Sequence, residues 1–387
     1  MEKTIKDLDI YISDGNYSSK YPRSEEFVEE GIPFIRGNNM VDGDISDDEM
    51  YYIAPEKHAI LLKGHVKAGD VLITTRGNIG QVAIVPERHE DSNINAQIVL
   101  LRTNPESLYN RYLLWALQSH RANEQYIALQ TGTALKQLPV GKLEKLSIKV
   151  ADIDEQHDIA NTLDKVYEVI KERRKELLLL DDLIKARFVE MFGDPVSNSY
   201  GLPEATLLEL GEFGRGVSKH RPRNDPKLLG GEYPLIQTGD VANAGLYITS
   251  YNSTYSELGL KQSKMWNKGT LCITIAANIA KTAILEFDAC FPDSVVGFTA
   301  NEKTNNIFVH YWFSFFQAIL EAQAPESAQK NINLKMLSEL KVIVPEKEKQ
   351  DEFVEFIKQV DKSKVAVQKA LDEAQVLFDS LMQQYFG

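Results

Sequence analysis

One long, regularly patterned stretch occurs twice in this sequence and limits the folds that the chain can adopt. The first copy runs from about Asp154 to Phe192 and the second from about Glu348 to Phe386, and a gap-free shift of 194 residues (350 − 156) sets Gln350 on Gln156. Apolar residues recur in both copies at alternating steps of three and four, the heptad pattern of helices that pack against another helix. At about 1.5 Å per residue each helix is about 58 Å long, so its apolar stripe needs a partner. The other copy is the obvious one.

The repeat continues into the segment that precedes each helix. Residues 70–84 match residues 270–284 at a shift of 200, and both are typical of a strand, a turn and a second strand with a shared asparagine, Asn78 or Asn278, at the tip. Each copy also predicts a later helix and a last strand, at residues 109–119 and 146–150 in the first copy and at 309–320 and 340–344 in the second. Strands and helices do not alternate as βαβ units, so each domain is expected to be α+β.

The expected architecture is therefore two tandem α+β domains, each followed by a long helix, in a pseudo-two-fold arrangement. The predicted boundaries are 1–150 for the first domain, 151–193 for the central helix, 194–345 for the second domain and 346–387 for the C-terminal helix. An antiparallel coiled coil is preferred, because a parallel pair needs a crossover of about 58 Å, for which only the second domain is available.

Composition and motif searches point away from several functions. The two cysteines, Cys272 and Cys290, make no disulfide framework or zinc spacing, the first residues do not resemble a signal peptide, and no run is long enough to span a bilayer; these features favour the cytoplasm and no membrane partner. The sequence has no P-loop and no Pro-Pro pair of the kind found in amino-methyltransferase motifs, and its seven histidines show no metal-binding pairing. The Gly-rich run Gly211–Gly216 is interpreted as a turn. No catalytic residue and no metal ligand is assigned.

The main positive signal is the loop Ser218–Asn224, with four basic or potentially basic side chains in a chain of formal net charge −13. A stiff basic loop suits phosphate positioning and guanine reading, and the first copy carries basic residues at the same place. Further candidates are the hairpin tips, the segments before the last strand, and two residues that follow equivalent strands. The candidate DNA-contacting residues are Lys20, Arg23, Arg36, Arg76, Asn78, Lys136, Gln137, Lys219, His220, Arg221, Arg223, Gln237, Asn278, Lys281, Lys330 and Asn331. A solubilising surface loop, or ordinary turn and cap chemistry, explains each of these segments as well.

Taken together, these residues resemble the specificity subunit of type I DNA restriction–modification systems over nearly the whole chain. The resemblance rests on the duplicated domain and long-helix plan and on five motifs: residues 69–80, residues 218–223, residues 233–240, the Glu155-Gln156 helix start and the Phe188–Gly193 helix end. The sequence departs from the family's pattern in small ways. Ala151 stands where the second copy has Pro345, and Arg173 takes the seam position of Val367.

The resemblance implies a non-catalytic subunit with two target-recognition domains. Each domain would read one half of a bipartite site in double-stranded DNA, and the paired helices would set the gap. Two methyltransferase subunits would dock on the repeated surfaces, and two ATP-dependent restriction subunits are optional members. S-adenosylmethionine, ATP and Mg²⁺ are expected on those partners, and no cofactor is expected on this chain. The alternatives are a coiled-coil adaptor that binds only protein and, as a weaker alternative, a self-contained modification enzyme.

Overall fold

The computed structural model describes residues 1–15, 18–133, 135–276, 278–323 and 332–387. The chain divides into two compact units, one made of Met1–Lys175 with Gln368–Gly387 and the other of Glu176–Val367. Both units mix helices and sheets, as the sequence predicted. No helix in the described part of the chain has the length and apolar character needed to cross a membrane.

Two four-stranded sheets form the framework of the first unit. One has the antiparallel order β2-β11-β8-β9, and the other has the order β10-β4-β7-β3, in which β10 runs parallel to β4. The strands are β1 (Glu2–Thr4), β2 (Ile10–Asp14), β3 (Phe27–Val28), β4 (Ile32–Ile35), β5 (Met40–Val41), β6 (Asp44–Ile45), β7 (Tyr51–Ile53), β8 (Val71–Thr74), β9 (Val82–Ile84), β10 (Asn93–Ile94), β11 (Ile98–Thr103) and β12 (Ser147–Lys149). The helices are α1 (Pro55–Ile60), α2 (Asn110–Gln118), α3 (His120–Leu129), α4 (Val140–Leu143) and the first part of α5 (Ile153–Phe192).

The second unit repeats this plan. Its sheets have the orders β14-β22-β19-β20-β16 and β17-β15-β21-β18. The strands are β13 (Glu204–Thr206), β14 (Gly211–Arg215), β15 (Leu229–Leu235), β16 (Tyr247–Ile248), β17 (Ser253–Tyr255), β18 (Met265–Trp266), β19 (Leu271–Thr274), β20 (Thr282–Leu285), β21 (Ala289–Cys290), β22 (Val295–Ala300) and β23 (Lys341–Ile343). The helices are α6 (Leu207–Leu210), α7 (Thr238–Asn243), α8 (Glu257–Lys261), α9 (Asn306–Gln323), α10 (Leu334–Glu339) and α11 (Lys347–Phe386).

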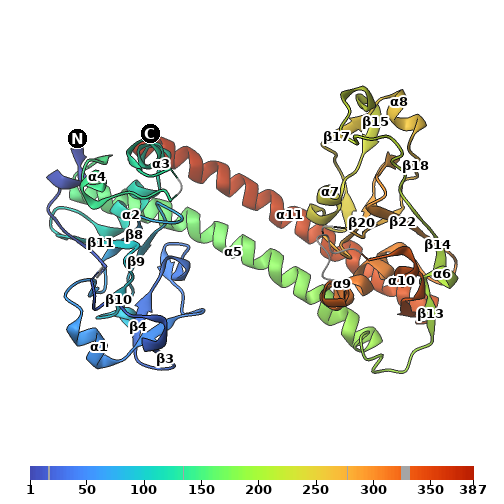
Figure 1. Cartoon of the computed structure of the whole chain (residues 1–387), viewed down its shortest axis with the longest axis horizontal. Helices are drawn as coiled ribbons and strands as arrows, with labels where there is room; N and C mark the ends of the chain where they lie inside the picture. The colour runs from blue at the N-terminus through green and yellow to red at the C-terminus, as the bar shows by residue number, and fades with distance from the viewer. Residues whose placement is uncertain (16–17, 134, 277, 324–331) are drawn as a thin grey trace. The chain divides into compact units, whose positions relative to one another are not determined.

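Alternation along the central strands places a core on each face of the main sheet. In β8, Val71 and Ile73 face a core shared with α2, whereas Leu72 faces the second sheet. In β19, Leu271 and Ile273 face the helix side and Cys272 the other side. This period of two is what a strand covered on both faces requires. In Figure 1, α2 lies over β8 and β9.

The two long helices run antiparallel within each unit. In the second unit Arg187 of α5 pairs with Glu352 of α11 at 3.1 Å, and Asp181, earlier in α5, pairs with Lys364, later in α11. In the first unit the rings of Tyr167 and Phe378 are 5.6 Å apart. Both helices have 40 residues, and each gives one part to either unit.

A buried glutamine joins the first turn of each long helix to its globular domain. Gln156 Oε1 accepts from the Tyr109 amide at 2.9 Å, while Nε2 donates to the carbonyl oxygens of Ser107 and Ala151. Gln350 makes the equivalent set: Oε1 accepts from the Thr304 hydroxyl at 3.0 Å. Its Nε2 donates to the carbonyl oxygens of Lys303 and Pro345. Both side chains are almost fully buried.

The interpretation of Gly211–Gly216 as a turn is wrong for most of its length, because residues 211–215 form β14, an edge strand paired with β22. A Cβ on Gly211 would lie 2.2 Å from the Thr299 carbonyl oxygen, and one on Gly216 would lie 2.3 Å from that of Phe291. The glycines therefore permit close backbone approach rather than a change of direction.

We expect Gln350→Leu to destabilise the protein by about 2–4 kcal/mol, because it leaves two buried carbonyl oxygens and one hydroxyl without their partner. At about 2–4 °C per kcal/mol for a unit of this size, the thermal midpoint should fall by several degrees. Gln368→Leu is the matched control on the same helix, since Gln368 is exposed and its side chain donates to the neighbouring Asp372. Equal midpoints for the two variants would contradict the role given to Gln350.

Candidate nucleic-acid interface

The basic loop Ser218–Asn224 connects β14 to the segment before β15 and is held by its own hydrogen bonds. The backbone amides of Lys219 and His220 both donate to Gln262 Oε1, at 2.7 and 3.0 Å. Arg221 Nη1 donates to the carbonyl oxygens of Ser218 and His220, at 2.6 and 2.8 Å. The loop is therefore ordered by contacts within the chain, as its composition suggested.

Two aspartates balance the charge of this loop. Arg221 lies 3.6 Å from Asp293, and Arg223 forms an ion pair with the same carboxylate. His220 Nε2 is 3.0 Å from Asp225 Oδ2. Hydrogen bonds from the Lys227 amide and from His220 hold the pKa of Asp225 below its ordinary value. The side chains of Arg221 and Arg223 remain about half exposed, so both guanidinium groups are accessible to a ligand.

A cavity of about 300 Å³ beside the loop brings two predicted residues together. Arg223 and Gln237 both line it, with Asn224, Thr238 and Ser253. Gln237 begins the short helix α7, where its amide donates to Asp240 Oδ2 at 2.8 Å. Its side-chain Nε2 reaches Ser253 Oγ at 3.4 Å and is otherwise exposed. A guanidinium and a carboxamide on one concave surface are groups that read base edges.

Arg36 occupies the equivalent place in the first unit but is engaged within the chain. Its amide donates to Asn39 Oδ1 at 3.1 Å, which repeats the bond between Gln237 and Asp240. Its guanidinium stacks 3.5 Å from the centroid of the Tyr51 ring, and Nη2 donates to the Glu49 carbonyl oxygen at 2.7 Å. Nearby, Lys20 and Arg23 are exposed. The two units thus present different chemistry at one shared position.

The two hairpin tips have the same internal geometry. Thr74 and Thr274 donate their hydroxyls to the carbonyl oxygens of Asn78 and Asn278. Each threonine oxygen also accepts an amide hydrogen, from Gln81 at 3.0 Å or Lys281 at 3.1 Å. Both asparagine side chains are exposed at the tips.

Each tip lies beside the segment that precedes the last strand. Arg76 pairs with Gln137 as an isolated antiparallel bridge, and Leu138 N donates to Thr75 O at 2.8 Å. Ile332 N makes the matching bond to Ile275 O at 2.9 Å. The structure therefore brings Arg76 and Gln137 together.

The remaining predicted residues are spread over other elements. Lys136 is exposed, and Lys281 lines a separate cavity of about 210 Å³ with Thr282 and His310. Lys330 and Asn331 lie outside the described residues. No sequence pattern identifies Asp293 or Tyr51 as part of the site. Their roles depend on contacts between distant segments.

Comparisons with known proteins fit this arrangement. A family model described as the type I restriction modification DNA specificity domain matches residues 5–179 and again residues 204–374. A candidate type I restriction enzyme specificity subunit, MjaX, of Methanocaldococcus jannaschii is 24% identical over 346 residues, covering 86% of this chain and 80% of that protein. The EcoBI specificity subunit of Escherichia coli is 25% identical over 142 residues, 36% of this chain and 29% of that protein.

Solved structures share the fold. The S subunit of a type I restriction–modification system from M. genitalium superposes with a TM-score of 0.61 at 18% identity, covering 100% of this chain and 96% of that chain. A second solved chain comes from a structure that describes complex assembly and conformational transition of the type I R-M system. It superposes with a TM-score of 0.55 at 15% identity, covering 100% of this chain and 97% of that chain.

Because the family model matches most of the chain, in two copies, this protein belongs to the family of type I restriction–modification specificity subunits. The resemblance to type I specificity subunits that the sequence predicted is confirmed. The expectation of two repeated domains with mixed helix and sheet content is confirmed as well.

The contrast between Arg36 and Gln237 gives a stability prediction. We expect Arg36→Ala to cost about 1–3 kcal/mol, because it removes a cation–π contact and a charged hydrogen bond to a backbone carbonyl. Gln237→Ala at the equivalent position should stay within about 0.5 kcal/mol, since that side chain is exposed. Thermal unfolding of the two variants measures both values, and a larger loss for Gln237→Ala would refute the assignment.

Proposed function

We propose that the chain is the non-catalytic DNA-specificity subunit of a type I restriction–modification complex, in which each unit reads one half of a bipartite site. The observation that carries this proposal is the internal repeat of a shared framework with different side chains at one equivalent position, where Gln237 is exposed and Arg36 is held against Tyr51. The hairpin tips and helix starts are the same in both units, whereas Arg36 and Gln237 differ at one position. Two domains with a common fold and different reading residues suit a site with two unlike halves.

The cavity beside the basic loop supports base reading in the second unit. Arg223 offers a guanidinium, which pairs with guanine O6 and N7, and Gln237 offers a carboxamide, which pairs with adenine N6 and N7. Lys219 and Arg221 on the same loop suit phosphate contacts, which fix register without reading sequence. Lys20 and Arg23 are the corresponding phosphate candidates in the first unit.

The long helices, in this proposal, form an antiparallel coiled coil that sets the gap between the half-sites. Each helix of 40 residues is about 60 Å long and contributes to both units. A DNA turn is about 34–36 Å long, so a spacer of this size suits half-sites one to two turns apart.

In this proposal, DNA methylation and restriction are carried out by partner subunits. Two methyltransferase subunits would dock on the repeated surfaces, bind S-adenosylmethionine and flip adenine out of the duplex. Two restriction subunits that use ATP and Mg²⁺ are optional additions. Because the substrate is genomic DNA, we expect the complex in the cytoplasm. A protein-binding adaptor without DNA recognition is the alternative that the following experiments exclude or support.

Arg223→Gln should weaken binding to the cognate site by about 1–3 kcal/mol and relax the base preference at one position of one half-site. Glutamine is chosen because a glutamate would face Asp293. The matched control is Lys335→Gln, which removes the same charge from an exposed residue of α10. Binding of the assembled complex to labelled duplexes provides the measurement, and unchanged affinity and preference would favour the adaptor.

Removing one heptad from each helix should narrow the gap in the recognised site. The equivalent segments 172–178 and 366–372 differ by the repeat shift of 194 residues. Their loss shortens each helix by about 10 Å, which corresponds to about three base pairs at 3.4 Å each. The chain is co-expressed with the methyltransferase subunit of its own locus, and methylated adenines are mapped across the host genome. A motif with an unchanged gap would exclude the spacer role.

A further inference from the structure

Two histidines and an aspartate from separate segments meet in the first unit. His58 lies on α1, His65 follows in the loop before β8, and Asp91 precedes β10. His58 Nε2 is 3.3 Å from Asp91 Oδ2, and His65 Nδ1 is 3.8 Å from Asp91 Oδ1. The three ligand atoms lie within 4.8 Å of one another. No local sequence pattern predicts this group, because six residues separate the two histidines and the aspartate lies further along the chain.

Hydrogen bonds fix which nitrogen of each imidazole carries the proton. His58 Nδ1 is 2.5 Å from Asn93 Oδ1, and His65 Nε2 is 2.7 Å from the Leu61 carbonyl oxygen. Both partners are oxygen acceptors, so these two nitrogens must be the donors. In the neutral rings the other nitrogens, His58 Nε2 and His65 Nδ1, hold lone pairs. Both lone pairs point at the Asp91 carboxylate, which also offers only lone pairs.

Three electron-pair donors that converge in this way are satisfied either by protons on the imidazoles or by a metal ion between them. A hydrogen bond from the outer nitrogen to an oxygen is also the usual support for an imidazole that ligates a metal, because it fixes the tautomer and ring orientation. We propose that His58 Nε2, His65 Nδ1 and the Asp91 carboxylate bind one divalent transition-metal ion of the zinc class, with Asn93 and Leu61 O as the supporting groups.

The distances suit such an ion. Zinc holds nitrogen and oxygen ligands at about 2.0–2.2 Å, so neighbouring ligand atoms in a tetrahedral site are about 3.3 Å apart. The contact between His58 and Asp91 already has this length, and the other ligand pairs must close by about 0.5–1.5 Å. Imidazole nitrogen selects zinc, nickel or copper over magnesium and calcium, which prefer oxygen.

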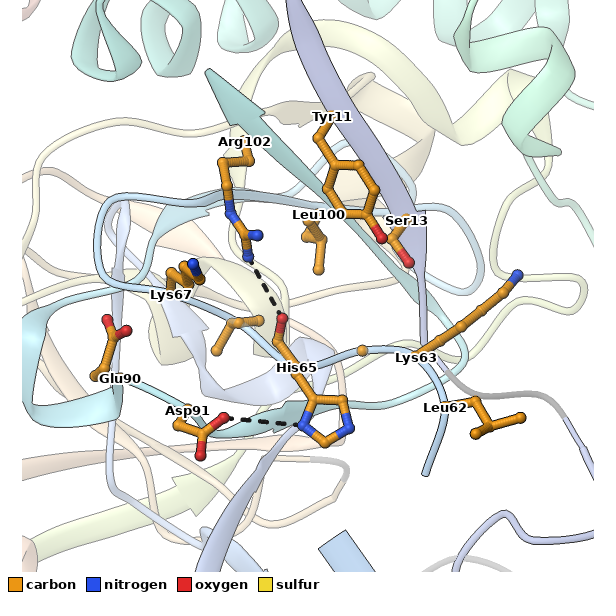
Figure 2. Close-up of a pocket in the computed structure, with 12 residues that line it drawn as sticks. Tyr11, Ser13, Leu62, Lys63, His65, Lys67, Glu90, Asp91, Leu100 and Arg102 are labelled. Atoms are coloured by element: carbon orange, nitrogen blue, oxygen red, sulfur yellow. Dashed lines mark hydrogen bonds and ion pairs between the residues drawn. The ribbon is translucent and has the colours of Figure 1, made fainter. Parts of the chain in front are cut away.

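The backbone holds two of the ligands side by side. Asp91 N donates to Val66 O and Val66 N donates to Ser92 O, both at 3.0 Å. Asp91 itself adopts a left-handed backbone conformation with φ of 61°, which is uncommon for residues other than glycine. Figure 2 shows the Asp91 carboxylate directed at the His65 ring, at the edge of a cavity of about 320 Å³.

The fourth coordination position faces solvent. The Asp91 side chain is 71% exposed, whereas that of His58 is only 13% exposed. Water would complete the set on the open side. The ion would join α1 and the loop at His65 to the start of β10. Strand β10 pairs with β4, and Arg36 directly follows β4. It would therefore stabilise the framework of the first recognition domain.

The repeat predicts one ion per chain. Asn93 pairs with Phe34 in the first unit, and Cys290 pairs with the equivalent Leu235 in the second, so Cys290 corresponds to Asn93. His65 pairs with Asn93, and Met265 pairs with Cys290, so Met265 corresponds to His65. The second unit thus has a methionine in place of His65 and a buried cysteine in place of Asn93.

The test uses the full-length, tag-free chain after metal depletion. Titration with Zn²⁺, followed by calorimetry, should give one site per chain, and Zn²⁺ should raise the thermal midpoint while Mg²⁺ should not. Co²⁺ bound at the site should show the visible absorption of a four-coordinate ion. Asn93→Ala should weaken Zn²⁺ binding about 10–100-fold, and Asp91→Asn or His65→Gln at least as much. His120→Gln, which alters an exposed histidine–glutamate pair, is the control and should bind normally.

Nitrogen-15 spectra of the metal-free chain at neutral pH provide a readout that does not depend on the folding of a variant. His58 should carry its proton on Nδ1 and His65 on Nε2. The proposal is overturned if the intact chain binds no Zn²⁺, if Asp91→Asn and His65→Gln bind as tightly as the unaltered chain, or if the tautomers are reversed. Because none of these measurements involves DNA, their failure leaves the recognition role untouched.

Discussion

A single buried carboxamide at the start of each long helix connects the two levels of this structure. Gln156 and Gln350 each accept one hydrogen bond and donate two, and every partner lies either just before the helix or at the start of the domain helix that packs on it. A carboxamide supplies two donor hydrogens and an acceptor oxygen without charge, so it satisfies both kinds of polar group in a buried place. These bonds set the direction in which each helix leaves its domain.

The packing of the long helices on the main sheet of each unit depends on that direction. Aromatic side chains of the long helices pack against those of the domain helix in each unit. They are Trp115, Tyr167 and Phe378 in the first unit and Phe188, Phe308 and Phe353 in the second. These residues close the helix face of the main sheet. The opposite face carries the second sheet, and its core includes Ile35 and Ile236, the residues just before Arg36 and Gln237.

The sequence predicted the parts that depend on periodicity and missed those that depend on contacts between distant segments. The shifts of 194 and 200 residues located both long helices, both hairpins and the pair Gln156 and Gln350, because heptads, alternation and internal repeats are local patterns. The inward guanidinium of Arg36 was not predictable, because Tyr51 approaches it only through the pairing of β4 with β7. The edge strand at Gly211 and the cluster of His58, His65 and Asp91 were not predictable for the same reason, because both depend on tertiary contacts.

An acidic chain can serve the proposed role because the basic groups of the loop Ser218–Asn224 are already ordered. A net charge of −13 disfavours non-specific binding, which depends on phosphate neutralisation and carries no sequence information. The guanidinium groups of Arg221 and Arg223 are positioned by Asp293 and by the loop backbone before any ligand arrives. Little side-chain entropy is then lost on binding, although a base edge or phosphate must compete with Asp293. In the proposed role a weak match would therefore be penalised, and the ion pair with Asp293 would lower affinity for DNA in general while raising selectivity for the correct half-site.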